Sequence, residues 1–254
     1  MLPKSGQDRQ AADTHYAVAL VPAAGRGERL GPGAPKSLRH LGGEPLVVHA
    51  VRRLAAARSV AAVVVAAPPG AADTVRELLA PVVLTAELVV VEGGGTRQAS
   101  VAAALAAAPT HCDVVLVHDA ARALAPPGLA DEVAAAVRAG HPAVVPVLPV
   151  VDTVRQVGAD GAGSSTIDRE LLRLVQTPQG FARAVLTEAH AACPDALTDD
   201  AGLVERLGLP VHTVPGHPSA LKVTRPFDLV VAHAVLAEES GVQDPSSGMA
   251  GSRT

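Results

Sequence analysis

The chain has 254 residues, of which 48% are apolar, enough to bury a substantial core in one α/β domain. Its formal net charge is −4, no long basic run occurs and only 1% of the residues are aromatic, which argues against a nucleic-acid-binding surface. No apolar stretch reaches the roughly 18 residues of a membrane helix. Cys112 and Cys193 match no metal or redox spacing, so we expect small core residues in a reduced, cytoplasmic setting.

Short β-branched apolar runs alternate with alanine-rich helical stretches along the first 150 residues. The predicted strands are 16–22, 60–67, 88–91, 114–117 and 143–147, and the predicted helices are 45–57, 71–79, 97–107 and 128–139. Apolar strands that alternate with helices predict a Rossmann-like, mostly parallel α/β sheet with helices on both faces. In such a sheet, ligands bind beyond the carboxyl ends of the strands.

The alternation stops after Pro149. Extended segments at 153–157 and 164–176 flank a glycine-rich turn. They predict a protruding β-arm over about 150–176, with a disordered insertion as the alternative. The alternation of polar and apolar residues in 153–157 favours the arm, because it gives one face something to bury.

The remaining chain returns to helical and strand patterns. Helices are predicted at 181–192, 201–207 and 226–236, and a strand at 211–214. We therefore expect one domain over 16–238, with polar, disordered tails at 1–15 and 239–254.

A long glycine loop follows the first predicted strand and carries Arg26, Arg29 and Lys36. Glycines let backbone N–H groups approach an anion, and the three cations add charge. The loop is not a Walker A loop, because Pro35 precedes Lys36, and it lacks the third glycine of a dinucleotide fingerprint. It predicts triphosphate binding; an ordinary turn with solvated charges is the alternative.

Three glycines, Gly93 to Gly95, precede the predicted helix at 97–107. Glycines before a helix N-terminus allow a base or a phosphate to approach the backbone closely. A flexible turn in which Thr96 is the N-cap is an equally good interpretation of the local sequence.

Polar residues also follow the later strands. Asp119 ends the strand at 114–117 and is a candidate ligand for magnesium or a hydroxyl, with a structural Asp119–Arg122 ion pair as the alternative. Lys222 precedes the last helix and either faces a substrate or lies on the surface. His118 is interpreted as a structural histidine without a catalytic role.

Seven motifs occur in a specific order and spacing. They are A-A-G-x-G-x-R-L with a following P-K (23–36), G-G-x-x-R-x-x-S (93–100), V-H-D-A-A-R (117–122), D-T-V (152–154), T-P-Q (177–179), T-D-D (198–200) and L-K-V-T-R-P (221–226). Over about 17–236 this set resembles the 2-C-methyl-D-erythritol 4-phosphate cytidylyltransferase family of the sugar-nucleotidyltransferase superfamily.

The resemblance implies an enzyme that transfers CMP from CTP to 2-C-methyl-D-erythritol 4-phosphate in the non-mevalonate isoprenoid pathway. The products would be CDP-methylerythritol and pyrophosphate, Mg²⁺ would be the cofactor, and the β-arm would build a homodimer with composite sites. A ribitol 5-phosphate cytidylyltransferase is the nearest alternative. A catalytically silent nucleotide-binding protein is the alternative from another class.

The resemblance also implies a role for individual residues. The catalytic residues would be Arg29, Lys36, Arg169 and Lys222. The nucleotide-binding residues would be Ala23, Ala24, Gly25, Gly27, Gly94, Gly95, Ser100, Asp119 and Ala120, with Asp119 also the metal ligand. The substrate-binding residues would be Arg122, Thr153, Thr177 and Thr198, of which Thr153, together with Arg169, would reach the partner subunit's site.

Three positions depart from the family pattern. Gly95 stands where an acidic residue is frequent, Ala123 where a proline is common, and Ala220 where an asparagine is frequent. These departures remove side-chain contacts or alter a loop, but none of them removes a cation.

Overall fold

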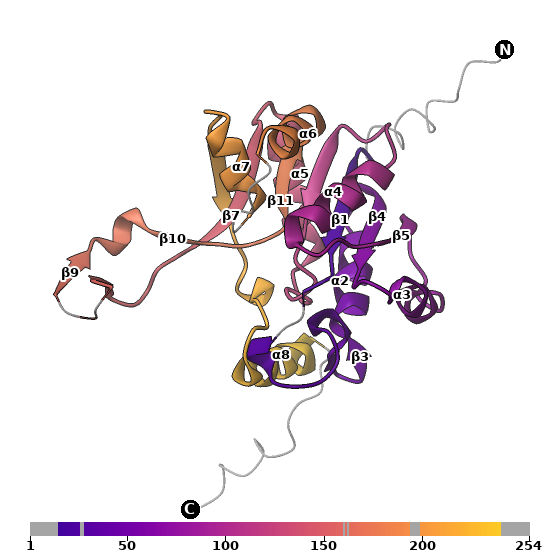
Figure 1. Ribbon diagram of the computed structural model, residues 1–254, viewed down its shortest axis with the longest axis horizontal. Helices are drawn as coiled ribbons and strands as arrows, with labels where there is room; N and C mark the ends of the chain where they lie inside the picture. Colours follow the sequence, from indigo (N-terminus) through magenta and orange to yellow (C-terminus); the bar gives the residue numbers. More distant parts are fainter. Residues whose placement is uncertain (1–14, 26–27, 160, 162, 194–198, 240–254) are drawn as a thin grey trace, which may run out of the picture.

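The structure is a computed structural model that describes residues 15–25, 28–159, 161, 163–193 and 199–239 (Figure 1). The predicted tails lie almost entirely outside these ranges. Among the described helices, none combines the length and the apolar character that crossing a membrane requires. Cys112 and Cys193 are buried, unpaired residues, as the sequence predicts.

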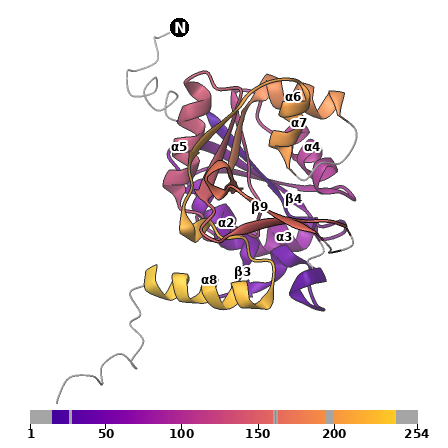
Figure 2. The same cartoon turned by 90° about the vertical axis from the view of Figure 1, so that its left-hand side faces the viewer.

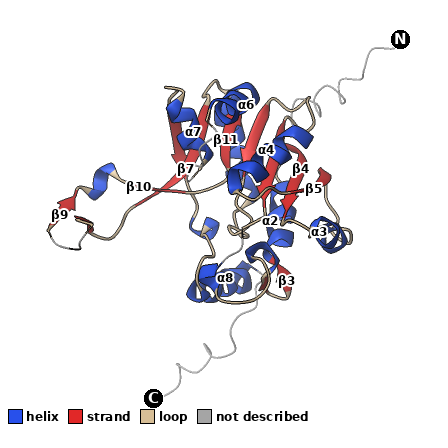
Figure 3. Ribbon diagram, viewed as in Figure 1, coloured by secondary structure: helices blue, strands red, loops and turns tan. Residues whose placement is uncertain are grey.

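A central sheet of eight strands organises the molecule (Figure 3). Its strands are β1 (Ala17–Pro22), β4 (Val60–Ala67), β5 (Glu87–Glu92), β6 (Val114–Val117), β7 (Ala143–Pro149), β10 (Arg173–Val175), β11 (Gln179–Ala182) and β12 (Val211–Pro215). The strands β5, β4, β1 and β6 are adjacent and parallel, and β12 is parallel to β7. Only β10 and β11 run antiparallel to their neighbours, which confirms the predicted mostly parallel sheet.

Helices cover both faces of this sheet. They are α2 (Leu46–Ala55), α3 (Ala72–Leu79), α4 (Arg97–Ala107), α5 (Pro127–Arg138), α6 (Arg183–Ala192) and α7 (Asp200–Arg206). The last helix, α8 (Pro226–Glu239), lies below the sheet in Figure 1. The two-residue period of β1 divides the core: Ala19 and Val21 belong to the cluster that contains α2, α3 and α5. Val18 and Leu20 belong to the cluster that contains α4, α6 and α7.

Apart from shifts of one or two residues at the ends of elements, three features of the main body differ from the prediction. The helix expected at 181–192 begins at Arg183, because the residues before it form β11 between β6 and β7, where Phe181 is fully buried. A short hairpin of β2 (His40–Leu41) and β3 (Glu44–Pro45) was not predicted; it buries Leu41 in the cluster that also contains α8. The last helix continues to Glu239, where an ion pair with Arg53 ties it to α2.

The predicted arm projects from the body of the molecule (Figure 1), so that in Figure 2 it points toward the viewer, with β9 in front of the sheet. Its two strands, β8 (Val154–Val157) and β9 (Ser164–Ile167), pair antiparallel around the glycine-rich turn. The prediction placed the arm's end too late: after the 3₁₀ helix η3 (Arg169–Leu171), β10 already pairs with β7 in the main sheet. Some of the arm's larger apolar side chains stay exposed within this chain, since Val157 is 61% and Leu171 81% exposed.

Candidate active site

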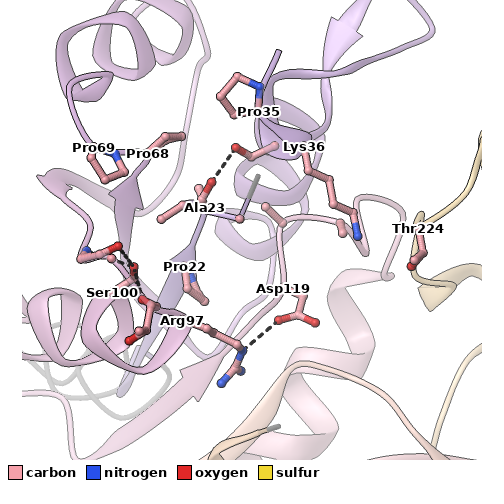
Figure 4. Close-up of a pocket in the computed structure, with 18 of the residues that line it drawn as sticks. Pro22, Ala23, Pro35, Lys36, Pro68, Pro69, Arg97, Ser100, Asp119 and Thr224 are labelled. Atoms are coloured by element: carbon pink, nitrogen blue, oxygen red, sulfur yellow. Dashed lines mark hydrogen bonds and ion pairs between the residues drawn. The ribbon is translucent and has the colours of Figure 1, made fainter. Parts of the chain in front are cut away.

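A pocket of about 920 Å³ opens beyond the carboxyl ends of β1, β4, β5 and β6, where the topology predicts a ligand site (Figure 4). Residues from all four strand ends line it. The predicted site residues in its wall are Ala23, Ala24, Gly25, Arg29, Lys36, Gly94, Gly95, Ser100, Asp119, Ala120 and Lys222. The fold therefore gathers most of the predicted nucleotide-binding residues at one place.

The glycine loop aims Lys36 into this pocket (Figure 4). Lys36 begins the short 3₁₀ helix η2 (Lys36–Leu38) directly after Pro35, whose fixed φ limits the freedom of the preceding chain. The Lys36 N–H donates to the Gly25 carbonyl at 3.3 Å, and the Ser37 hydroxyl donates to the Ala23 carbonyl at 2.8 Å. These bonds connect the two ends of the loop and fix the origin of the lysine side chain.

The amine of Lys36 is held among other cations. Burial, together with the positive charges of Lys222 and Arg29, lowers the pKa of Lys36 to about 8, although Asp119 acts in the opposite direction. The positive charge of Lys36 is partly removed from water and lies near like charges, so its protonated form is destabilised. A bound polyanion, such as a triphosphate, would stabilise the protonated amine.

Arg39 closes the glycine loop from outside the pocket, a role that the sequence did not reveal. Its guanidinium donates to the carbonyls of Gly31 at 2.6 Å, Pro32 at 2.7 Å and Ala34 at 3.0 Å. Between them Gly33 has φ +134°, and a Cβ there would meet the guanidinium at 2.9 Å. Three hydrogen bonds from the Arg39 side chain thus hold the segment that leads to Lys36.

Asp119 lies between two cations. Its Oδ2 is 2.6 Å from the Lys222 amine, and its Oδ1 is 3.4 Å from Nε of Arg97. Burial opposes ionisation, but Lys222 and Arg97 outweigh it and hold the pKa of Asp119 well below its usual value. The alternative of an Asp119–Arg122 pair is wrong, because Arg122 instead donates to the carbonyls of Ala220 at 2.7 Å and Val175 at 3.0 Å.

Arg97 is a pocket residue to which the sequence analysis assigned no role. It donates to Asp200 at 2.6 Å in addition to Asp119, and His190 approaches the other oxygen of Asp200 at 2.9 Å. Asp200 is only 1% exposed, so this ion pair lies in the interior. The arginine of the G-G-x-x-R-x-x-S motif was the available signal, but its partner on α7 is too distant in sequence for a local pattern to predict.

The turn before α4 ends in the N-cap Thr96 and also lines the pocket, so it agrees with both interpretations of its sequence. Thr96 is an N-cap that accepts a hydrogen bond from the Ala99 N–H at 3.0 Å, as the alternative proposed. Gly94 and Gly95 nevertheless line the pocket. A Cβ at Gly94 would lie 2.4 Å from that of Ala99, so the close packing of this turn requires glycine.

The remaining predicted site residues fall into three groups. Arg122 and Thr177 lie beside the pocket without lining it, and Thr177 accepts a hydrogen bond from the Asp119 N–H at 3.0 Å. Thr153 and Arg169 are exposed on the arm, away from this pocket (Figure 1). Gly27, Thr198 and the loop cation Arg26 lie outside the described residues.

A metal ion at this pocket would depend on Asp119. Within the described part of the chain, no group of three histidine, cysteine or acidic residues could hold a metal ion. Mg²⁺ commonly binds through one or two carboxylates plus substrate phosphates and water. An ionised Asp119 at the wall of a cation-rich pocket fits such a shared site.

An α/β sheet whose first glycine loop aims a lysine at a pocket with a carboxylate and a second lysine is the arrangement of a nucleotidyltransferase. The family model of the 2-C-methyl-D-erythritol 4-phosphate cytidylyltransferases matches residues 17–238. The chain belongs to this family, whose members are nucleotidyltransferases, and the ribitol 5-phosphate alternative is not favoured.

Individual relatives agree with the family match. The 2-C-methyl-D-erythritol 4-phosphate cytidylyltransferase of Frankia casuarinae is 55% identical over 230 residues, which cover 91% of this chain and 85% of the relative. That of Streptomyces coelicolor is 56% identical over 228 residues, covering 87% and 84%. The crystal structure of the Thermus thermophilus protein of the same name matches with a TM-score of 0.71 and 41% identity, covering 86% of this chain and 98% of that one.

Proposed function

We propose that this chain transfers CMP from CTP to 2-C-methyl-D-erythritol 4-phosphate in the cytoplasm, giving CDP-methylerythritol and pyrophosphate for isoprenoid synthesis. The convergence of Lys36, Lys222 and Asp119 in one pocket at the ends of β1 and β6 is the observation that carries the proposal. The names of the relatives supply the identity of the two substrates.

The chemistry follows from charge. The substrate phosphate is an anionic nucleophile at neutral pH, so no general base is required. It must attack the α-phosphorus in line while pyrophosphate leaves, and the main barrier is the repulsion between two anions. Fixed cations and positioning lower this barrier, because preorganised charges need no reorganisation as the reaction proceeds.

Each part of the site has a proposed task. Arg29 and Lys36 hold the triphosphate and stabilise the charge at the pentavalent phosphorus. Lys222 and the arm residue Arg169 position the attacking phosphate. The nucleotide's base and ribose lie against Gly94, Gly95 and Ser100. The further nucleotide contacts are Ala23, Ala24, Gly25, Gly27 and Ala120, and the polyol contacts are Arg122, Thr153, Thr177 and Thr198.

Asp119 is the proposed ligand of Mg²⁺. Its low pKa keeps the carboxylate ionised at neutral pH, and each carboxylate oxygen can accept more than one partner. When bound, the metal would neutralise charge on the triphosphate. The ion pairs with Lys222 and Arg97 hold the carboxylate at the wall of the pocket.

The arm is the proposed dimer contact. Val151, Val157 and Leu171 are between 61% and 81% exposed, although apolar side chains of this size are usually buried. Arg169 lies on the arm and lines no part of its own chain's pocket. Burial against a second copy would cover these side chains, and would bring Thr153 and Arg169 to the other subunit's site.

Pyrophosphate release in the presence of Mg²⁺ tests the reaction directly. The chain should release pyrophosphate from CTP with 2-C-methyl-D-erythritol 4-phosphate, and much more slowly with ribitol 5-phosphate. Faster turnover with ribitol 5-phosphate, or none with either acceptor, would refute the proposed substrate. The Lys36→Ala variant serves as the background control.

A further inference from the structure

His118 is a fully buried histidine beneath the turn that carries Asp119 and Arg122. It is only 1% exposed, so its ring nitrogens depend on protein partners. Its Nδ1 lies 3.1 Å from the Thr177 hydroxyl and its Nε2 lies 3.3 Å from the Arg122 carbonyl oxygen. Both ring nitrogens therefore have partners next to the pocket.

The Thr177 side chain joins β6 to β11 just beyond the last residue pair of these two strands, Gln179 and Val117. Gln179 pairs with Val117, and the same antiparallel register places Thr177 opposite Asp119. Pro178 has no N–H to donate. Instead, the Thr177 hydroxyl accepts the Asp119 N–H at 3.0 Å, and this bond fixes the start of the turn.

The partners determine where the protons lie. The Thr177 oxygen accepts from Asp119, so its single proton can be donated to His118 Nδ1. With Nδ1 unprotonated, the neutral ring carries its proton on Nε2, which donates to the Arg122 carbonyl. The opposite tautomer would place the Nε2 lone pair against the carbonyl oxygen and is therefore disfavoured.

We propose that His118 and Thr177 are a positioning pair that fixes the two ends of the turn from which Asp119 and Arg122 enter the site. Thr177 holds the Asp119 backbone, and His118 holds Thr177 and the Arg122 backbone. The Val223 N–H also donates to the Ala121 carbonyl at 2.9 Å, so the same turn is joined to the segment that carries Lys222.

The pair therefore sets the distance between groups that must act together. The Asp119 carboxylate and the Lys222 amine are 2.6 Å apart, which leaves little room for displacement of the turn. Misplacement of reacting groups by about 1 Å can cost about a hundredfold in rate. His118 acts only through other residues, so it is a positioning residue and not a catalytic one.

Two substitutions of His118 each remove one of its two hydrogen bonds. If the reaction proposed above is correct, their kinetic effects can be compared. His118→Asn keeps an acceptor near the Nδ1 position and loses the donor to Arg122. His118→Gln keeps a donor near the Nε2 position and loses the acceptor for Thr177. Thr177→Val removes the hydroxyl with little change of shape, and Thr187→Val, which removes an exposed hydroxyl on α6, is the matched control.

The expected result is a split between kinetic constants. His118→Asn should raise KM for the polyol phosphate about tenfold and change KM for CTP less than about twofold. His118→Gln and Thr177→Val should lower kcat about tenfold or more, because Asp119 is displaced, while Thr187→Val should behave as the unmodified chain. Equal effects of the two His118 variants on both substrates, or no effect, would overturn the proposal.

The tautomer provides a test that does not depend on the reaction. Nitrogen NMR of the histidine-labelled full chain should show that His118 carries a proton on Nε2 and none on Nδ1, and should show a changed signal in Thr177→Val. A proton on Nδ1 would overturn the pair even if the chain is active. If the unmodified chain shows no turnover, the proposed reaction is refuted. The position of the proton on the His118 ring then still tests the positioning pair.

Discussion

The pocket and the arm of this molecule are constructed in opposite ways. Around the pocket, Asp200 is buried, Asp119 is partly buried, and both are engaged in ion pairs within one chain. On the arm, Val151 and Leu171 are 76% and 81% exposed, and β8 pairs only with β9. The fold of one chain thus preorganises the charges at the pocket, whereas the arm offers side chains that only another surface can bury.

The largest expected effect is at the pocket. Lys36→Ala should lower kcat by about 10²–10³, because it removes a preorganised cation from the transferring phosphate. Steady-state pyrophosphate release by a variant with an unchanged circular dichroism spectrum measures this. The control is Arg58→Ala, since the Arg58 side chain is 90% exposed and remote from the pocket lining. A loss below tenfold would remove Lys36 from the catalytic residues.

The arm should give the second largest effect, and one that can be rescued. Arg169→Ala should lower kcat/KM about 10- to 100-fold, because the attacking phosphate loses its positioning cation. Mixing this variant with Lys36→Ala should restore roughly a quarter of the unmodified activity, because half of the dimers then contain one intact site. If activity does not return after subunit exchange is confirmed by mass, the two regions do not share sites.

The pH dependence of the rate should reveal the lowered pKa of Lys36. With a pKa of about 8, the free enzyme loses the lysine charge as the pH rises above 8, so kcat/KM for CTP should fall about tenfold per pH unit there. In Lys36→Arg the guanidinium stays charged, and the fall should disappear whatever the absolute rate. A profile of Lys36→Arg that falls in parallel with that of the unmodified chain would assign the titration to another group.

The smallest expected effect is on stability. The folded-state pKa of Lys36 lies below its ordinary value of 10.5, so the folded chain binds fewer protons than the unfolded chain between these pH values, and stability rises with pH there. Lys36→Met should therefore raise Tm by about 3 °C at pH 7. The gain should shrink towards pH 10. Equal Tm values at pH 7 would show that the protonated lysine is not destabilising.

The sequence predicted the elements with strong local patterns. The run 60–67 is uniformly apolar, and the structure has β4 at the same residues. Pro226 begins α8 as expected for the first turn of a helix. The strand β11 was not predicted, because Gln179–Ala182 is too short to show a period of two, and because tertiary pairing with β6 and β7 determines its conformation.

The site shows the same limit. Local motifs identified Lys36, Asp119 and Lys222, and the structure places all three at one pocket. The ion pair of Arg97 with Asp200 joins residues that are more than a hundred positions apart, so no local pattern could reveal it. Arg39 was overlooked because its function is to bind backbone carbonyls, and a sequence does not show where those carbonyls point.

A crystal structure with Mg²⁺ and a non-reactive CTP analogue tests the central claim most directly. The account predicts that the Lys36 amine and the Arg29 guanidinium lie within hydrogen-bond distance of the triphosphate, with the cytosine beside the turn at Gly94 and Gly95. A triphosphate bound elsewhere, with Lys36 and Arg29 directed into solvent, would contradict it.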